Sequence, residues 1–311
     1  MNLILSTAPH IRSPRSTQKL MFNVAIALLP SAAAGVYFFG MDALITLLVS
    51  MATAVLSEFL WQKINKQTVR VGDGSALLTG LILGLIVSPT VPWWAVMIGS
   101  AFAILIVKQL FGGIGDNFLN PAMAARAVLL ASWPAYLTKH VLPSCWSGAD
   151  AVTSATPLSG AMEASYLDLF LGKGIPGAIG ETCKAAILLG LVFLLLTKTI
   201  TWRIPVVTMA SACAFSWIFG TDPLETALSG GILFAAVFMA TDYATSPMSS
   251  RAQLAYAAGI GLITVVIRNY GSYPEGVTYA VLFMNILTPL LDRCMPHRIY
   301  GYQKKREAKK A

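Results

Sequence analysis

The segment Asp150–Leu158 combines side chains that could take part in covalent chemistry. It offers a carboxylate and three hydroxyl groups among small neighbours: Asp150, Thr153, Ser154, Ala155 and Thr156. A threonine hydroxyl can become the ester oxygen of a phosphate group, and small neighbours leave room for the group that is attached. Small polar residues are also ordinary loop composition, so the segment taken alone is compatible with an unmodified loop.

The cysteines and histidines form no metal-binding pattern. The four cysteines are scattered and the three histidines are isolated, so the sequence contains no C-x-x-C, no C-x-x-C-H and no pair of histidines at helical spacing. Redox chemistry in this chain would need another cofactor. Cys145 and Cys183 fall on the same predicted side of the membrane, where a disulfide is conceivable, but their spacing leaves the pairing open.

Three charged residues lie in apolar surroundings, where an ionisable group is costly unless it has a use. Glu58 either extends to the membrane interface beside neighbouring lysines, or binds a cation or carries a proton. Asp242 precedes a helix break at Ser246-Pro247 and is either an ion-linked carboxylate or a cap at that break. Arg126 either caps loop carbonyls or contacts a phosphate or cofactor.

The composition places these residues in a membrane protein. Of 311 residues, 56% are hydrophobic and 12% are charged, and the mean hydropathy is +0.68, whereas soluble domains carry about 25% charged residues. A spanning helix needs about 20 apolar residues. The sequence predicts an all-α protein with ten spans, near 21–40, 42–62, 76–92, 93–112, 122–137, 182–200, 204–220, 226–242, 253–269 and 275–292. Asn117 and Asn120 are predicted to cap the helix that begins at Pro121.

The basic residues predict the orientation, because Lys and Arg are retained on the cytoplasmic side. With both termini inside, all but four of the 22 Lys and Arg residues lie on the inner face. The four outer ones are Lys139, Lys173, Lys184 and Arg268. The net charge of +8 therefore reflects topology and predicts no nucleic-acid partner, and the basic C-terminal run is an inner anchor or a lipid contact.

The ten spans divide into two halves of five. A related stretch occurs in each half: 78–83 runs on to Ser88-Pro89, and 228–233 runs on to Ser246-Pro247. Because five is odd, duplicated halves would have opposite orientations, as in many transporters; the alternative is that Gly, Ser and Pro are common where membrane helices pack closely. The predicted organisation is a cytoplasmic tail (1–20), a first five-helix repeat (21–137), an extracytoplasmic loop (138–181), a second repeat (182–292) and a basic cytoplasmic tail (293–311).

The pattern Asp150-x-x-Thr153-x-Ala155-Thr156 resembles the signal by which a flavin transferase moves the FMN part of FAD onto a threonine hydroxyl. Four further stretches resemble the D subunit of the Rnf complex and the related B subunit of the sodium-pumping NADH:quinone oxidoreductase. They are Gly112–Ala122 with Ala125-Arg126-Ala127, Met239–Pro247, Tyr273–Val277 and Ala8–Ser13. The resemblance covers nearly the whole chain. The first predicted span begins near residue 21, and this position is more similar to that in the Rnf subunit than to that in the quinone-reductase subunit.

This resemblance implies an inverted-repeat fold similar to urea transporters, in the inner membrane of a bacterium or archaeon. The complex would transfer electrons between ferredoxin and NAD and would move Na⁺ or H⁺. The chain would relay electrons through FMN bound covalently to Thr156, as one subunit that is not catalytic alone. Partners would include a second subunit with covalent FMN, iron–sulfur subunits and the maturing flavin transferase. A second, noncovalent flavin such as riboflavin is also implied, with Asp242, Glu58 and Arg126 as candidate ion or flavin contacts.

A channel or secondary transporter for a small solute such as urea is the alternative function, because the same repeat would serve it without redox chemistry. The two hypotheses differ at Thr156, since only the first requires a covalent flavin.

Overall fold

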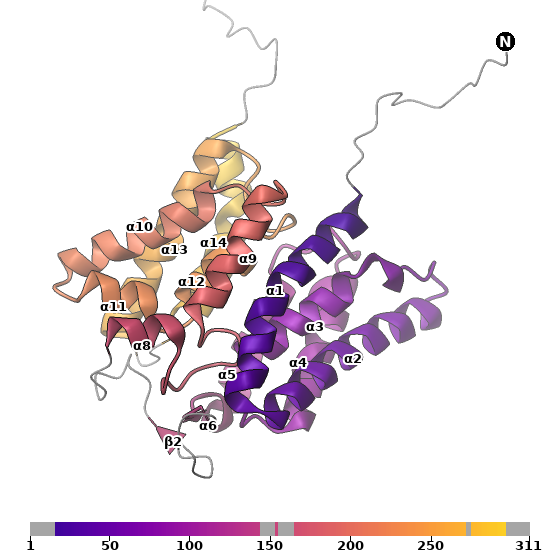
Figure 1. The fold of residues 1–311 in the computed structure, drawn as a ribbon. Helices are drawn as coiled ribbons and strands as arrows, with labels where there is room; N and C mark the ends of the chain where they lie inside the picture. The colour runs from indigo at the N-terminus through magenta and orange to yellow at the C-terminus, as the bar shows by residue number, and fades with distance from the viewer. Residues whose placement is uncertain (1–15, 144–152, 155–164, 272–274, 297–311) are drawn as a thin grey trace, which may run out of the picture.

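The computed structural model describes residues 16–143, 153–154, 165–271 and 275–296. These residues are mostly helical, as the sequence predicts. Figure 1 shows two groups of helices side by side, α1 to α5 in indigo to magenta and α9 to α14 in red to yellow.

The first group begins with a long hairpin of α1 and α2. Ser16 caps α1 by accepting a hydrogen bond from Lys19 N at 3.2 Å, and Gly40 joins the two helices with φ of 68°, a conformation that favours glycine. The elements of this group are α1 (Thr17–Phe39), α2 (Met41–Ile64), η1 (Val71–Asp73), α3 (Ser75–Ile86), α4 (Trp93–Phe102) with its π-helical continuation η2 (Ala103–Gln109), α5 (Pro121–Ser132) and α6 (Pro134–Leu137).

Two short strands and one short helix connect the two groups in the sequence. Strand β1 (His140–Val141) pairs antiparallel with β2 (Thr153–Ser154), with His140 opposite Ser154 and Val141 opposite Thr153. Helix α8 (Tyr166–Leu171) follows. The pairing fixes the backbone of Thr153–Ser154 beside the end of the first group.

The second group combines short helices with two longer ones that follow them in the sequence. Asp222 caps helix α11 (Pro223–Leu228) by accepting a hydrogen bond from Leu224 N at 3.0 Å. Pro223 occupies the first helical position, where its missing N–H group removes no hydrogen bond of the helix. The elements are α9 (Lys184–Leu196), α10 (Arg203–Ile218), α11 (Pro223–Leu228), α12 (Ile232–Phe234), the π-helical η4 (Ala235–Met239), α13 (Ser250–Tyr270) and α14 (Val277–Cys294).

The two groups meet where α1 packs on α9 and where α5 packs on α14. Within the first group, α2 and α3 approach closely at Gly80, where a Cβ would lie 2.7 Å from the carbonyl oxygen of Ser50. Small residues allow this kind of close packing between helices in membranes. The core runs continuously through both groups and includes Leu28, Leu83, Ile187 and Phe234, all fully buried.

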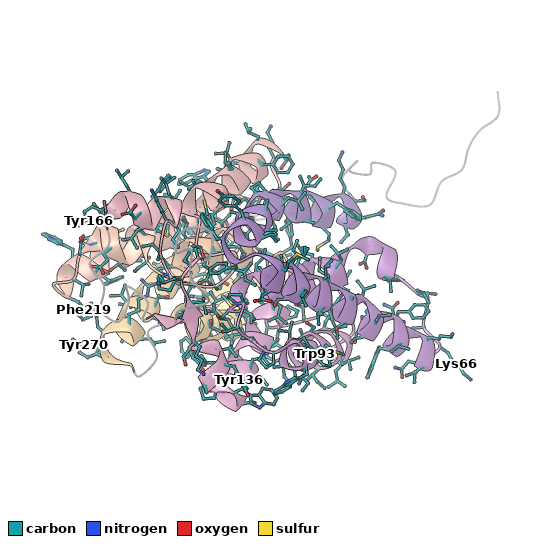
Figure 2. All side chains as sticks on the ribbon, turned by 60° about the horizontal axis from the view of Figure 1, so that its bottom comes forward. Lys66, Trp93, Tyr136, Tyr166, Phe219 and Tyr270 are labelled. Atoms are coloured by element: carbon teal, nitrogen blue, oxygen red, sulfur yellow. The ribbon has the colours of Figure 1, made fainter. Side chains whose placement is uncertain are left out.

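The bundle has two distinct ends. The start of α1 and the finish of α14 lie at one end, called here the terminal end, whereas α6, β2 and α8 lie at the opposite, loop end (Figure 1). Exposed aromatic side chains project from the surface of both groups, as Figure 2 shows for Trp93, Tyr136, Tyr166, Phe219 and Tyr270. Aromatic side chains in such positions are typical of a membrane–water interface.

Some helices, such as α3, α5 and α9, are shorter than the predicted spans, whereas α1, α2 and α13 are longer. Among the described residues, α1, α2 and α13 are long and apolar enough to cross a membrane, and five further apolar helices have 10–17 residues. The predicted span 76–92 is wrong at its end, because α3 stops at Ile86. Leu85 and Val87 then accept backbone hydrogen bonds from Gly180 N at 2.7 Å and Ile179 N at 3.3 Å.

The predicted span 226–242 is also wrong as a continuous helix. It is interrupted at Ser229-Gly230-Gly231 between α11 and α12. Arg268 donates to the carbonyl oxygens of Thr226 and Ser229 at 2.8 and 3.0 Å, and Lys184 donates to that of Gly230 at 3.1 Å. Interrupted helices are tolerated inside membranes where other protein groups satisfy the freed carbonyls, and these two cations do so.

Candidate functional site

A cavity of about 630 Å³ lies between the two groups of helices towards the terminal end. We call it the mixed cavity, because its lining combines apolar side chains from several helices with polar groups. The apolar lining includes Leu20, Val24, Leu78, Ile82 and Phe238. The polar lining includes Thr79, Lys108, Asn117, Asn120, Asp242 and Asp292. A pocket of this size and composition is suited to an organic cofactor or ligand.

Asn120 joins the two groups at this cavity. Its side chain caps α5 by accepting from Ala122 N and Met123 N at 3.1 and 3.3 Å, which confirms the predicted cap. Its amide nitrogen also donates to the carbonyl oxygen of Met239 at 3.3 Å. The same prediction is wrong for Asn117, whose amide donates to the carbonyl oxygen of Leu119 instead.

Asp242 lies on the other side of the mixed cavity, in the irregular segment between η4 and α13. It is half-buried, and its carboxylate accepts a hydrogen bond from Thr245 Oγ1 at 3.1 Å. The backbone carbonyl of Asp242 also accepts from Ser246 N at 3.0 Å. The structure thus places Asp242 both at the helix break and on the cavity wall.

Glu58 is buried within the protein and does not extend to the surface. Its carboxylate receives two hydrogen bonds from Lys108 Nζ, at 2.9 and 3.0 Å, and the two side chains are 2% and 4% exposed. Gln109 Nε2 donates to the same carboxylate at 2.6 Å, and Lys108 also donates to Ser75 Oγ at 2.5 Å. We call Glu58, Lys108, Gln109 and Ser75 the lysine cluster.

A second large cavity adjoins the lysine cluster. This polar cavity has a volume of about 940 Å³ and is lined by Glu58, Gln109 and residues of the connections 65–74 and 110–116. Gln67, Thr68 and Arg70 in its lining are exposed. The cavity therefore opens to the surface of the protein.

Arg126 is buried in a second cluster, towards the loop end. Its guanidinium donates to Glu181 Oε1 at 3.2 Å and forms a second hydrogen bond with Glu275. His140 Nε2 lies 3.7 Å from the other oxygen of Glu275. We call these four residues the arginine cluster. Arg126 therefore pairs with two carboxylates, and the expectation that it caps loop carbonyls is wrong.

His140 connects the arginine cluster to the segment that carries the predicted flavin acceptor. Burial lowers the pKa of His140, the neighbouring Arg126 lowers it further and the carboxylate of Glu275 opposes both effects. The backbone of His140 pairs with that of Ser154 in β2. Thr153 and Ser154 thus lie beside the cluster, whereas Asp150, Ala155 and Thr156 lie outside the described residues, as does Cys145. Cys183 has a free thiol.

Sequence reasoning missed four ionisable members of these clusters: Lys108, His140, Glu181 and Glu275. Each occurs next to an apolar helix, and an ionisable residue in such a place is a functional candidate by default. Glu275 also lies within a stretch that carries the family resemblance. These signals identify candidates, but only the fold shows which of them are partners.

The fold and its buried clusters define a polytopic α-helical membrane protein with the mixed and polar cavities towards one end. A sequence model of the NQR2, RnfD, RnfE family matches residues 4–301. The chain belongs to this family.

Relatives resemble the chain over nearly their whole length. The D subunit of the Na⁺-translocating ferredoxin:NAD⁺ oxidoreductase complex of Acetobacterium woodii is 46% identical over 319 residues, covering 99% of each chain. The D subunit of the proton-translocating ferredoxin:NAD⁺ oxidoreductase complex of Clostridium ljungdahlii is 40% identical and covers 93% of each. The D subunit of the ion-translocating oxidoreductase complex of Escherichia coli O81 is 35% identical, covering 96% of this chain and 99% of the relative.

Proposed function

We propose that the chain is the D subunit of an ion-translocating ferredoxin:NAD⁺ oxidoreductase complex, and that it relays electrons through an FMN linked by a phosphoester to Thr156. The observation that carries this proposal is the acceptor pattern from Asp150 to Thr156, found in a chain whose relatives are named as the D subunit of such complexes. When bound, the FMN supplies the one- and two-electron chemistry that no side chain of the protein can supply.

The described part of the loop is compatible with an attached flavin. Strand pairing holds Thr153–Ser154 against His140, and the acceptor residue follows two positions later in the sequence. His140, Arg126 and Glu275 would set the charge near the attachment point. The flavin transferase would recognise Asp150 during maturation, and small neighbours such as Ala155 would leave room for that enzyme.

The mixed cavity is our candidate for the second, noncovalent flavin. Its volume of about 630 Å³ falls within the range of pockets that bind organic ligands. Apolar side chains such as Leu78 and Ile82 offer walls for a flat ring system, whereas Asn120 and Asp242 provide polar groups near its edge. A riboflavin-sized group therefore fits the residues present.

The transported ion is Na⁺ or H⁺. Relatives with the same subunit name include one named for Na⁺ and one named for protons, so the name alone does not decide the ion. Asp242 and Glu58 are our candidate ion-linked groups, since each carries a carboxylate at the wall of a cavity. Arg126 pairs with two carboxylates and would instead influence a flavin through its charge.

We further propose that the chain crosses the inner membrane about ten times, as two inverted halves with both termini in the cytoplasm. The start of α1 and the finish of α14 share one end of the bundle, and exposed Lys66 at the finish of α2 belongs to the predicted inner face. The loop that carries Thr156 would then be extracytoplasmic. Other subunits, including iron–sulfur subunits and a second subunit with covalent FMN, would deliver and remove electrons.

In-gel flavin fluorescence of the denatured chain tests the attachment. The wild-type chain should fluoresce, Thr156→Ala should not, and Ser154→Ala serves as the matched control because it removes a hydroxyl from the same segment at a position that the acceptor pattern leaves open. Undiminished fluorescence from Thr156→Ala would refute the assignment. A wild-type chain without fluorescence would favour the alternative of a channel or secondary transporter without redox chemistry.

A further inference from the structure

The lysine cluster forms part of the wall between the polar cavity and the mixed cavity. Glu58 and Gln109 line the polar cavity, whereas Lys108 and Ser75 line the mixed cavity. The carboxylate of Glu58 and the ammonium group of Lys108 are joined by hydrogen bonds of 2.9 and 3.0 Å. One buried ion pair therefore has a different cavity on each side.

From this arrangement we propose that Lys108 and Glu58 transfer protons from the water of the polar cavity to a reducible group bound in the mixed cavity. This inference rests on the proposed second flavin, and it names the residues that would protonate that flavin. A lysine ammonium can lose a proton in a buried place, and the neighbouring carboxylate can replace that proton.

The proposed transfer is balanced in two steps. When the bound group receives electrons from the reduced carriers of the complex, an N–H bond of Lys108 breaks and the proton moves to that group. Glu58 then takes a proton from cavity water and passes it to the neutral amine. Both side chains return to their starting charges, and one proton has moved from the polar cavity to the mixed cavity.

Hydrogen bonds hold the pair in place for this role. Gln62 Nε2 and Gln109 Nε2 both donate to Glu58, at 3.3 and 2.6 Å. Ser75 Oγ accepts from Lys108 at 2.5 Å and donates to Asp73 at 2.7 Å. The other charged groups that line the two cavities are Arg70, Asp73 and Asp116 in the polar cavity and Asp242 and Asp292 in the mixed cavity.

The substitution Lys108→Arg separates proton transfer from charge pairing. An arginine keeps the positive charge beside Glu58 but does not give up its proton in proteins. In the purified complex we expect normal assembly and a normal content of extractable flavin, with proton uptake on reduction slowed at least tenfold. The matched control, Lys63→Arg, changes an exposed lysine of α2 and should leave the uptake rate unchanged.

A second variant and a second readout keep the proposal testable if Lys108→Arg does not fold or assemble. If Lys108→Arg does not assemble, the double variant Glu58→Gln/Lys108→Met leaves no unpaired buried charge and should slow proton uptake equally. Infrared difference spectra followed in time during reduction provide the second readout: a transient band of a protonated carboxyl group in the wild type should be lost in Glu58→Gln and retained in Glu225→Gln, which changes an exposed acid of α11.

The outcomes separate this inference from the proposed function. A wild-type uptake rate in Lys108→Arg or in the double variant, or an unchanged carboxyl band in Glu58→Gln, would overturn the proton transfer while leaving the second flavin in place. A wild-type complex with no extractable flavin would instead remove the second flavin, and this inference with it.

Discussion

Arg126, midway along α5, forms an ion pair with Glu275, which lies 149 residues further along the chain and just before α14. The same guanidinium donates to Glu181 Oε1 at 3.2 Å, just before α9. A single buried side chain therefore connects the first group of helices to the segments that lead into two helices of the second group.

Replacing Arg126 by methionine should destabilise the protein strongly. The substitution leaves Glu181 and Glu275 buried together without their cation, and breaking a buried pair in this way costs about 3–5 kcal/mol. Thermal unfolding in detergent, followed by size-exclusion chromatography, measures the effect. Arg251→Met, which changes an exposed arginine, is the control. A melting temperature equal to that of the control would contradict the role of Arg126 as a connection between the two groups.

Local features of the fold could be predicted from the sequence. Asn120 followed by Pro121 predicts a helix start, because an asparagine cap and a proline in the first position both favour one, and α5 begins there. The long apolar runs predict α1, α2 and α13. These features depend on neighbours in the sequence, which hydropathy and capping preferences describe well.

The stability of the protein should depend on pH through His140. Burial lowers the pKa of His140 in the folded protein, whereas in the unfolded chain the value is about 6.5. Below that pH the unfolded chain binds the proton more readily, so stability is lost as the pH falls, by at most about 1.4 kcal/mol per pH unit. Glu275 and Arg126 are the charged groups that face this imidazole.

The variant His140→Gln should remove this contribution. Its melting temperature should fall less than that of the wild type between about pH 7.5 and about pH 5.5, on either side of the unfolded-state value. An identical fall in both proteins would show that His140 takes up its proton as easily in the fold as in the unfolded chain.

Removing the charge of Asp242 should weaken the coupling between electron transfer and ion movement. The variant Asp242→Asn is nearly isosteric, and its amide can still accept the hydrogen bond from Thr245, so folding and attachment of flavin at Thr156 should be preserved. If Asp242 binds the cation, a loss of affinity of about 1.4 kcal/mol corresponds to a tenfold change.

Reconstituted vesicles that contain the whole complex provide the measurement for Asp242. We expect fewer ions moved per electron, or a lower turnover if the two processes are strictly coupled. Wild-type values for both quantities would show that Asp242 acts only as a cap at the helix break. Asp292→Asn, which changes another acid of the mixed cavity, tests whether the effect belongs to Asp242 or to the cavity as a whole.

The candidate site could be predicted only in part, because its partners are distant in the sequence. Glu58 and Asp242 stand out as acids in apolar surroundings, but the partner of Glu58 lies 50 residues away at Lys108. Hydropathy also did not predict the break between α11 and α12, where Arg268 binds the freed carbonyl oxygens of Thr226 and Ser229. Hydropathy reports the apolar character of a segment and carries no information on such long-range hydrogen bonds.

Labelling of introduced cysteines tests the predicted topology. Single cysteines placed between residues 138 and 181, in a chain without its own cysteines, should react in intact cells with a reagent that does not cross the membrane. Cysteines in the connection 65–74, which we assign to the inner face, should react only after the cells are broken. The reverse pattern would invert the topology and place the Thr156 loop in the cytoplasm.

The intact mass of the purified chain tests the central claim most directly. We predict an excess equal to one FMN less one water, lost in Thr156→Ala and localised by peptide mapping to Asp150–Leu158. Because the phosphoester is covalent, the excess should persist after denaturation. A wild-type mass equal to that of the unmodified chain, measured on protein purified from a host that has the flavin transferase, would contradict the proposed function.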